Sequence, residues 1–110
     1  MSMTSEQLEA QFAERGMPHS GGLLVLAPDD AIELVRAAER ERIPILGVDG
    51  FFISPTEAVS PLVHLADFSA AAATGRGNWR DAEGFITSRR SLGLTFEVTL
   101  GEPLLPEQPG

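Results

Sequence analysis

The longest apolar stretch of the chain lies near its middle, at residues 43–53, where Asp49 is the only charged residue. Pro44 has a fixed φ and no N–H group, so it suits the start of a strand better than an interior position. A single strand over 44–53 would need a bulge at one of its two glycines. The alternative is a hairpin turning on Asp49-Gly50, with arms of only about four residues. We favour the single buried strand.

Residues 30–42 repeat apolar positions with the period of an α-helix. Ile32, Val35 and Ala38 share one side, and Asp30 and Glu33 have the spacing of a capping box. The other side carries charges, which we interpret as a solvated surface. The apolar run 23–27 comes before this helix, so residues 23–53 predict strand, helix, strand, with the two strands parallel in one sheet.

The first part of the chain predicts a short helix and a loop. Leu8 and Phe12 lie four residues apart within 4–15, which begins with Thr and Ser as candidate caps. Residues 16–22 contain three glycines and a proline, so we expect a loop there.

After the central stretch, residues 54–61 hold two prolines and predict a connection. Residues 62–68 then fit a strand antiparallel to the central one. Alternatively, Ser60-Pro61 resembles a helix cap with proline at the first helical position. A helix over 78–90 would begin at Asn78, and Gly84 within it suggests close contact with the sheet.

The last strand and the tail complete the expected domain. Residues 94–100 alternate strictly between apolar and polar positions, and 101–110 hold three prolines and two glycines and should be loose. The order is a helix followed by β-α-β-β-α-β, in one α+β domain spanning 1–110. A ferredoxin-like split βαβ plan with an extra N-terminal helix has this order.

The charge of the chain is −8 and is unevenly distributed. Residues 1–67 contain eleven acids and four arginines, residues 68–96 two acids and four arginines, and the remainder three acids. Such a field argues against nucleic acid or an anionic membrane as direct partner, because phosphates need the opposite charge. It favours a basic protein partner, or serves solubility alone.

The residues that carry chemistry in enzymes are scarce. No cysteine is present, which excludes disulfides, thiolate zinc sites and cysteine nucleophiles. A metal would have to use His19, His64 and carboxylates, and His64 with Asp67 lacks a third ligand. The sequence contains no G-x-S-x-G motif, and Gly75-Arg-Gly77 does not continue into a dinucleotide-binding pattern. We therefore expect no catalytic residue, no cofactor and no metal.

The expected location is the cytoplasm. Residues 1–6 lack the positive start and apolar centre of a signal peptide. No apolar run approaches the roughly 18 residues of a membrane span.

The layout of residues 23–100 resembles that of small immunity proteins of bacterial polymorphic-toxin systems. The resemblance rests on the amino-acid sequence of residues 43–52 and on the elements around it. These are the charged helix before it, and the tryptophan-bearing helix and the strand Gly93-Leu-Thr-Phe-Glu-Val98 after it. Such proteins are not enzymes; they bind and block a toxin, often a basic nuclease. The resemblance implies a contact surface around an aromatic pair, formed by Asp49, Phe51, Phe52, Glu57 and Asp67.

Three functions remain open on the sequence. The first is an acidic immunity-type inhibitor that binds a basic toxin or nuclease. The second is a small-ligand or catalytic domain with a pocket on the open face of its sheet. The third is a homodimeric domain without further activity. Asp49 bears on the choice, because a carboxylate in an apolar run is either exposed at a turn or placed there for a partner.

Overall fold

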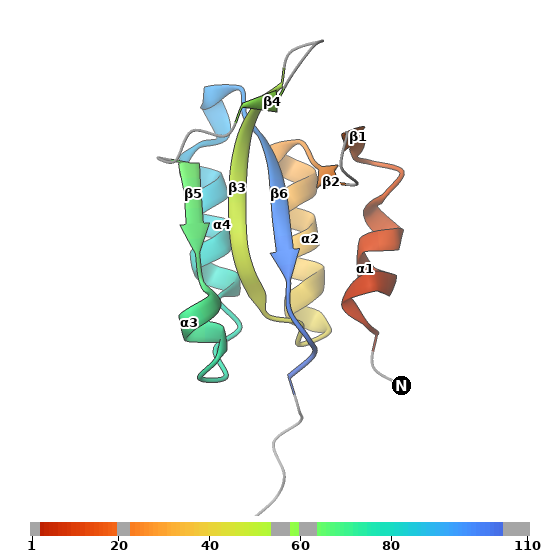
Figure 1. The fold of residues 1–110 in the computed structure, drawn as a ribbon, viewed down its shortest axis with the longest axis vertical. Helices are drawn as coiled ribbons and strands as arrows, with labels where there is room; N and C mark the ends of the chain where they lie inside the picture. Colours follow the sequence, from red (N-terminus) through yellow and green to blue (C-terminus); the bar gives the residue numbers. More distant parts are fainter. Residues whose placement is uncertain (1–2, 20–22, 54–57, 60–63, 105–110) are drawn as a thin grey trace, which may run out of the picture.

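The nine-residue strand β3 (Ile45–Ile53) is the centre of the sheet (Figure 1). It pairs antiparallel with β4 (Ala58–Val59), β5 (Leu65–Asp67) and β6 (Thr95–Leu100). The single-strand prediction is therefore confirmed, as is the antiparallel strand expected within 62–68. The computed structural model describes residues 3–19, 23–53, 58–59 and 64–104.

A register irregularity near the start of β3 decides which side chains face the core. The pairing of β3 with β6 shifts between Ile45 and Gly47, where one of the two predicted bulge sites lies. Beyond the shift Val48 is buried, at 1% exposure, so its neighbours Gly47 and Asp49 lie on the opposite face of the sheet.

Two helices cover the core face of the sheet, α2 (Pro28–Arg40) and α4 (Trp79–Ser88) (Figure 1). Their buried residues and those of β3 and β6 belong to one hydrophobic core, which includes Ala31, Leu34, Val35, Ala38, Val48, Ala82, Ile86, Phe96 and Val98. The buried Phe96 and Val98 alternate with partly or fully exposed residues, as the pattern of 94–100 predicts.

Helix α2 begins two residues earlier than predicted. Pro28 occupies the first turn, where its fixed φ fits and its missing N–H is not needed. The residue before it, Ala27, caps the helix without a side-chain hydrogen bond, so the Asp30–Glu33 capping box was a wrong prediction. All charged residues of α2 except Asp30 are exposed. Four of its charged residues form ion pairs outside the helix: Asp29 with Arg90, Asp30 and Glu33 with Arg15, and Arg36 with Glu83.

The N-terminal helix α1 (Ser5–Phe12) has the predicted cap and buried face. Thr4 and Gln7 form a reciprocal capping box, and Leu8 and Phe12 are buried. The prediction of a loop over 16–22 was wrong for β1 (Met17–His19), which pairs antiparallel with β2 (Leu23–Val25).

Proline is tolerated in β1 because of its place in the ladder. Pro18 lies opposite Leu24, and Leu26, two residues after Leu24, exchanges both main-chain hydrogen bonds with Phe96 of β6. Alternate residues of a strand point their main-chain groups to the same edge, so Leu24 also points away from β1. Pro18 therefore needs no N–H at this position.

The Leu26–Phe96 bridge also gives the direction of the crossover. The bridge is antiparallel, and β6 is antiparallel to β3, so the chain at Leu26 runs parallel to β3. The strands on either side of α2 are thus parallel as predicted, with β6 between them.

Asn78 and Trp79 fix the start of α4 against the start of β3. Asn78 adopts a left-handed conformation (φ 64°) and makes no side-chain cap bond. Its Nδ2 instead donates to the carbonyl oxygens of Ile45 (3.1 Å) and Phe68 (3.3 Å), and Trp79 Nε1 donates to that of Ile43 (2.7 Å).

The remaining elements contain two further corrections. Gly84 lies on the exposed side of α4, opposite the buried Ala82 and Ile86, so its predicted contact with the sheet was wrong. The first residues of the predicted loose tail are fixed, because Gly101 N–H donates to Pro44 O (2.9 Å) and Leu104 N–H to Arg42 O (2.8 Å).

The α+β class is confirmed, together with the extra N-terminal helix. Four short elements add to the predicted order β-α-β-β-α-β: β1, β4, α3 (Ser69–Ala72) and a 3-10 turn (Arg90–Leu92). The ferredoxin-like strand order is not confirmed, because β6 pairs with β3. Of the predicted connection, residues 54–57 and 60–61 lie outside the described part of the chain. Within the described residues, no helix has the length and apolar character needed to cross a membrane.

Candidate functional site

The face of the sheet away from α2 and α4 is open. In Figure 1 the two helices lie behind β5, β3 and β6, and none of the described helices crosses in front of these strands. Leu65, Asp67 and Thr99 are exposed on this face. We call it the open face.

Strand pairing sets the neighbours on the open face. Asp49 lies opposite Leu65 of β5 on one side and opposite Glu97 of β6 on the other. In an antiparallel ladder, residues directly opposite each other share a face, with Cβ atoms about 5 Å apart. Two carboxylates therefore stand side by side in the middle of the open face.

The environment of this acid pair disfavours its charged form. Partial burial raises the pKa of Asp49. Burial also raises the pKa of Glu97, and the charges of Asp49 and Glu9 raise it further, while a hydrogen bond with Thr99 opposes these effects. The Oε2 atom of Glu97 is buried, and no described residue donates a hydrogen bond to it.

The chemistry of this arrangement is that of a cation acceptor. Two adjacent carboxylates, one with a buried oxygen that lacks a donor, can accept hydrogen bonds from a guanidinium or ammonium group. Among the described residues, no group of three or more His, Asp or Glu side chains is arranged to hold a metal ion.

The structure brings some of the predicted contact residues together and separates another. Asp49, Phe51 and Asp67 lie on the open face. Phe52 points to the other face near the end of β3, is 43% exposed, and contacts the ring of His64 edge-on. Glu57 lies outside the described residues.

Asp67 has a local structural role as well. Its carboxylate accepts hydrogen bonds from the N–H (2.9 Å) and the hydroxyl (2.6 Å) of Ser69 at the start of α3. These two bonds lower the pKa of Asp67, so this carboxylate stays charged where its neighbours on the face are pushed toward neutrality.

Sequence reasoning missed Glu97 as a site residue. The alternation of 94–100 places Glu97 on the polar side of its strand. Its position opposite Asp49 depends on the register between β3 and β6, which are separated by more than forty residues of chain.

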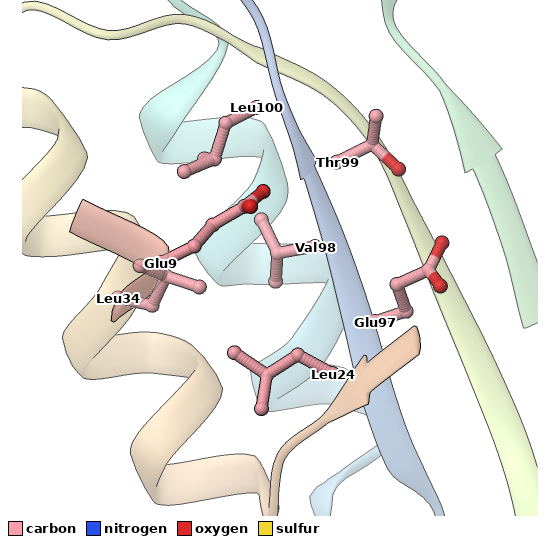
Figure 2. A pocket seen from close by; sticks show the side chains of 7 residues that line it. All are labelled: Glu9, Leu24, Leu34, Glu97, Val98, Thr99 and Leu100. Atoms are coloured by element: carbon pink, nitrogen blue, oxygen red, sulfur yellow. The ribbon is translucent and has the colours of Figure 1, made fainter. Parts of the chain in front are cut away.

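A groove adjoins the open face at β6. It has a volume of about 230 Å³ and lies between α1 and β6 (Figure 2), lined by Glu9, Leu24, Leu34, Glu97, Val98, Thr99 and Leu100. A second groove, of about 220 Å³, lies between α2 and α4. The Arg36–Glu83 ion pair belongs to its lining, so charges there are already matched.

Comparison with protein-family models and with curated proteins found no match to this chain, so the functional inference rests on the geometry and charge of these residues.

Proposed function

We propose that this protein is a non-enzymatic binding protein, an acidic immunity-type inhibitor whose open face binds a basic surface of a toxin or nuclease in the cytoplasm. The observation that carries the proposal is the position of Asp49 directly opposite Glu97. Each carboxylate lacks a basic neighbour on the adjacent strand, because Asp49 is flanked by Leu65 and Glu97.

The acid pair lowers the stability of the free protein. Like charges directly opposite each other in a sheet are destabilising, on a scale of about 0.2–1 kcal/mol per pair. A buried polar atom without a hydrogen bond adds a desolvation cost of roughly 1–3 kcal/mol, and Oε2 of Glu97 is such an atom. Residues that lower the stability of the folded protein in this way are typical of functional sites.

A basic side chain of a partner would reduce both costs. An arginine guanidinium carries five N–H donors in a planar fork, so it could donate to both carboxylates at once and offset one of their two negative charges. Leu65, 45% exposed, and the partly buried Phe51 flank the acids and would exclude water from such a contact.

The charge of the whole chain supports the same partner. At −8, the protein attracts a basic molecule over a distance and speeds its association. Exposed acids away from the open face contribute to this steering, whereas the acid pair would fix the bound orientation.

The test is affinity capture from the native host with matched variants. Asp49→Asn/Glu97→Gln removes two charges on the open face, and Glu6→Gln/Glu14→Gln removes two exposed charges in and after α1. We expect the wild type and the Glu6/Glu14 variant to retain a basic protein that the Asp49/Glu97 variant loses. Recovery of no basic protein, or its retention by the Asp49/Glu97 variant, would overturn the proposal.

The raised pKa of Glu97, which lines the groove, also favours a second candidate, a small-ligand or catalytic domain. A small cationic ligand would bind in the groove next to Glu97 and would not contact the rest of the open face. Thermal unfolding with agmatine, a small guanidinium compound, distinguishes the two candidates. Stabilisation by millimolar agmatine that Glu97→Gln abolishes would support the small-ligand function, and no stabilisation would count against it.

A further inference from the structure

The second edge of β6 is paired at one position among the described residues. One edge of the strand follows β3 along its length. On the other edge, Leu26 and Phe96 exchange two main-chain hydrogen bonds of 2.8 and 2.7 Å, and this bridge is isolated.

The main-chain groups beyond the bridge point in the same direction as those of Phe96. Alternate residues of a strand direct their N–H and C=O groups to the same edge, so Val98 and Leu100 point away from β3. The next residue, Gly101, points toward β3 and donates to Pro44 O, as this alternation requires. No described residue outside the β3–β6 ladder forms a main-chain hydrogen bond with Val98 or Leu100.

The groove between α1 and β6 lies along this edge (Figure 2). Continued pairing of β2 with β6 would place Leu24 opposite Val98, but both residues instead line the groove. The main chain of Leu24 also points toward β6, because Leu26 does. The ladder thus stops where the groove opens.

The walls of the groove differ in chemistry on its two sides. Glu97 and Thr99 project toward the open face, while Val98 and Leu100 project toward the core face. Leu34 of α2 lines the core side, and Glu9 of α1 adds a second carboxylate. A strand has the same two-sided alternation of side chains.

We propose that an extended segment of a partner adds to β6 in this groove, forming main-chain hydrogen bonds with Val98 and Leu100. Basic residues at alternate positions of the segment meet Glu97 and Glu9, and the apolar residues between them pack against Leu24 and Leu34. Strand addition of this kind obtains affinity from main-chain bonds and specificity from alternate side chains. This inference rests on the proposed function, because it specifies how the basic partner binds.

Charge selects this occupant over a second copy of the chain. Each copy carries −8 and would bring its own Glu9 and Glu97 to the shared edge. Four carboxylates would then meet without a basic side chain from the groove lining, which contains none.

A defined probe tests the inference without the natural partner. The probe is a capped peptide of about eight residues in which lysine and valine alternate, a length that fits one strand. One control replaces each lysine by glutamate, and another carries N-methyl groups on every second amide. We expect the first peptide alone to bind, and to slow amide hydrogen exchange at Val98 and Leu100 by about 10-fold or more at saturation.

Two charge reversals near the N-terminus provide the matched variants. Glu9→Lys changes the groove lining, whereas Glu14→Lys changes an exposed position outside it. We expect Glu9→Lys to weaken peptide binding by about 5-fold or more at low salt, and Glu14→Lys by less than about 2-fold.

Three results would overturn strand addition. They are binding of the N-methylated peptide as tight as that of its parent, unchanged exchange at Val98 and Leu100 in the saturated complex, and slow exchange of both amides already in the free protein. None of these three results would refute the proposed function if capture of a basic partner still depends on Asp49 and Glu97. If capture does not depend on these two acids, but the peptide still slows exchange at Val98 and Leu100, only the open-face contact is refuted.

Discussion

Asp49 on β3 and Glu97 on β6 lie directly opposite each other on the open face of the sheet. Asp49 has the exposed Leu65 as its other cross-strand neighbour, so no basic residue of the ladder offsets the pair. A threonine at either position would form the same strand without the repulsion. The pair therefore reduces the stability of the free protein at the place where a partner's positive charge would be most favourable.

Replacing Glu97 tests the cost of this pair. Burial and the neighbouring Asp49 raise the pKa of Glu97 in the folded protein above its ordinary value of 4.5. Between the unfolded and folded pKa values the folded state holds more protons, so the free energy of unfolding falls as pH rises through this window. The penalty is absent below the window and complete above it. Glu97→Gln should then raise the free energy of unfolding by about 0.5 kcal/mol near neutral pH, and by less near pH 4.

Denaturant unfolding at the two pH values measures this effect. Glu6→Gln, at an exposed position of α1, provides the control and should change the free energy of unfolding little at either pH. A Glu97→Gln protein that is less stable than the wild type near neutral pH would show that the pair is not repulsive.

Two substitutions of Asn78 separate its side-chain bonds from its backbone conformation. Asn78→Gly keeps the left-handed conformation and loses the hydrogen bonds to Ile45 and Phe68, which should cost about 1 kcal/mol. Asn78→Ala loses the bonds and also strains the backbone, which should cost about 1 kcal/mol more. Thermal or denaturant unfolding of both variants gives the two contributions. Equal stability of the alanine variant and the wild type would contradict both roles.

Alanine substitutions at Gly84 and Gly93 should change the stability of the protein in opposite directions. An added Cβ meets no atom within 4 Å at either position. Gly84 is exposed and lies within α4, away from both of its ends. Gly84→Ala should therefore stabilise the protein by about 1 kcal/mol. Gly93 has a φ of 78°, so Gly93→Ala should destabilise it by about 1 kcal/mol. Denaturant midpoints check both, and a shared sign would refute this explanation.

The bonds from Ser69 should control the titration of Asp67. The hydroxyl and the N–H of Ser69 hold the pKa of the Asp67 carboxyl below the ordinary value of 3.8. Ser69→Ala removes the hydroxyl bond, the larger cause, so the pKa of Asp67 should rise toward that value. Carboxyl-carbon NMR titration of the wild type and of the Ser69→Ala variant measures this change. An unchanged pKa would assign the effect to the backbone bond alone.

Local patterns predicted the core of the fold well. The apolar run 43–53 became β3, and the spacing of Ile32, Val35 and Ala38 gave the buried face of α2. These predictions succeeded because periodicity reports burial directly. The prediction for residues 16–22 failed at β1, because a proline-containing edge strand has the composition of a loop.

The candidate site was only partly predictable. Asp49 stood out because a carboxylate in an apolar run is costly, and Phe51 and Asp67 share its face. Glu97 and Glu9 could not be found, because they approach the site only through strand register and the packing of α1. Phe52 was included as the neighbour of Phe51, yet successive residues of a strand point to opposite faces.

The most direct test of the open-face account is the dissociation constant of the captured basic partner for wild-type protein and for Asp49→Asn/Glu97→Gln. Titration calorimetry at about 50 mM and about 500 mM salt separates contacts between charges, which salt weakens, from contacts that salt leaves unchanged. The account predicts that the double variant binds about 10-fold or more weakly at low salt, and that the difference narrows at high salt. Equal dissociation constants for the two proteins at both salt concentrations would contradict it.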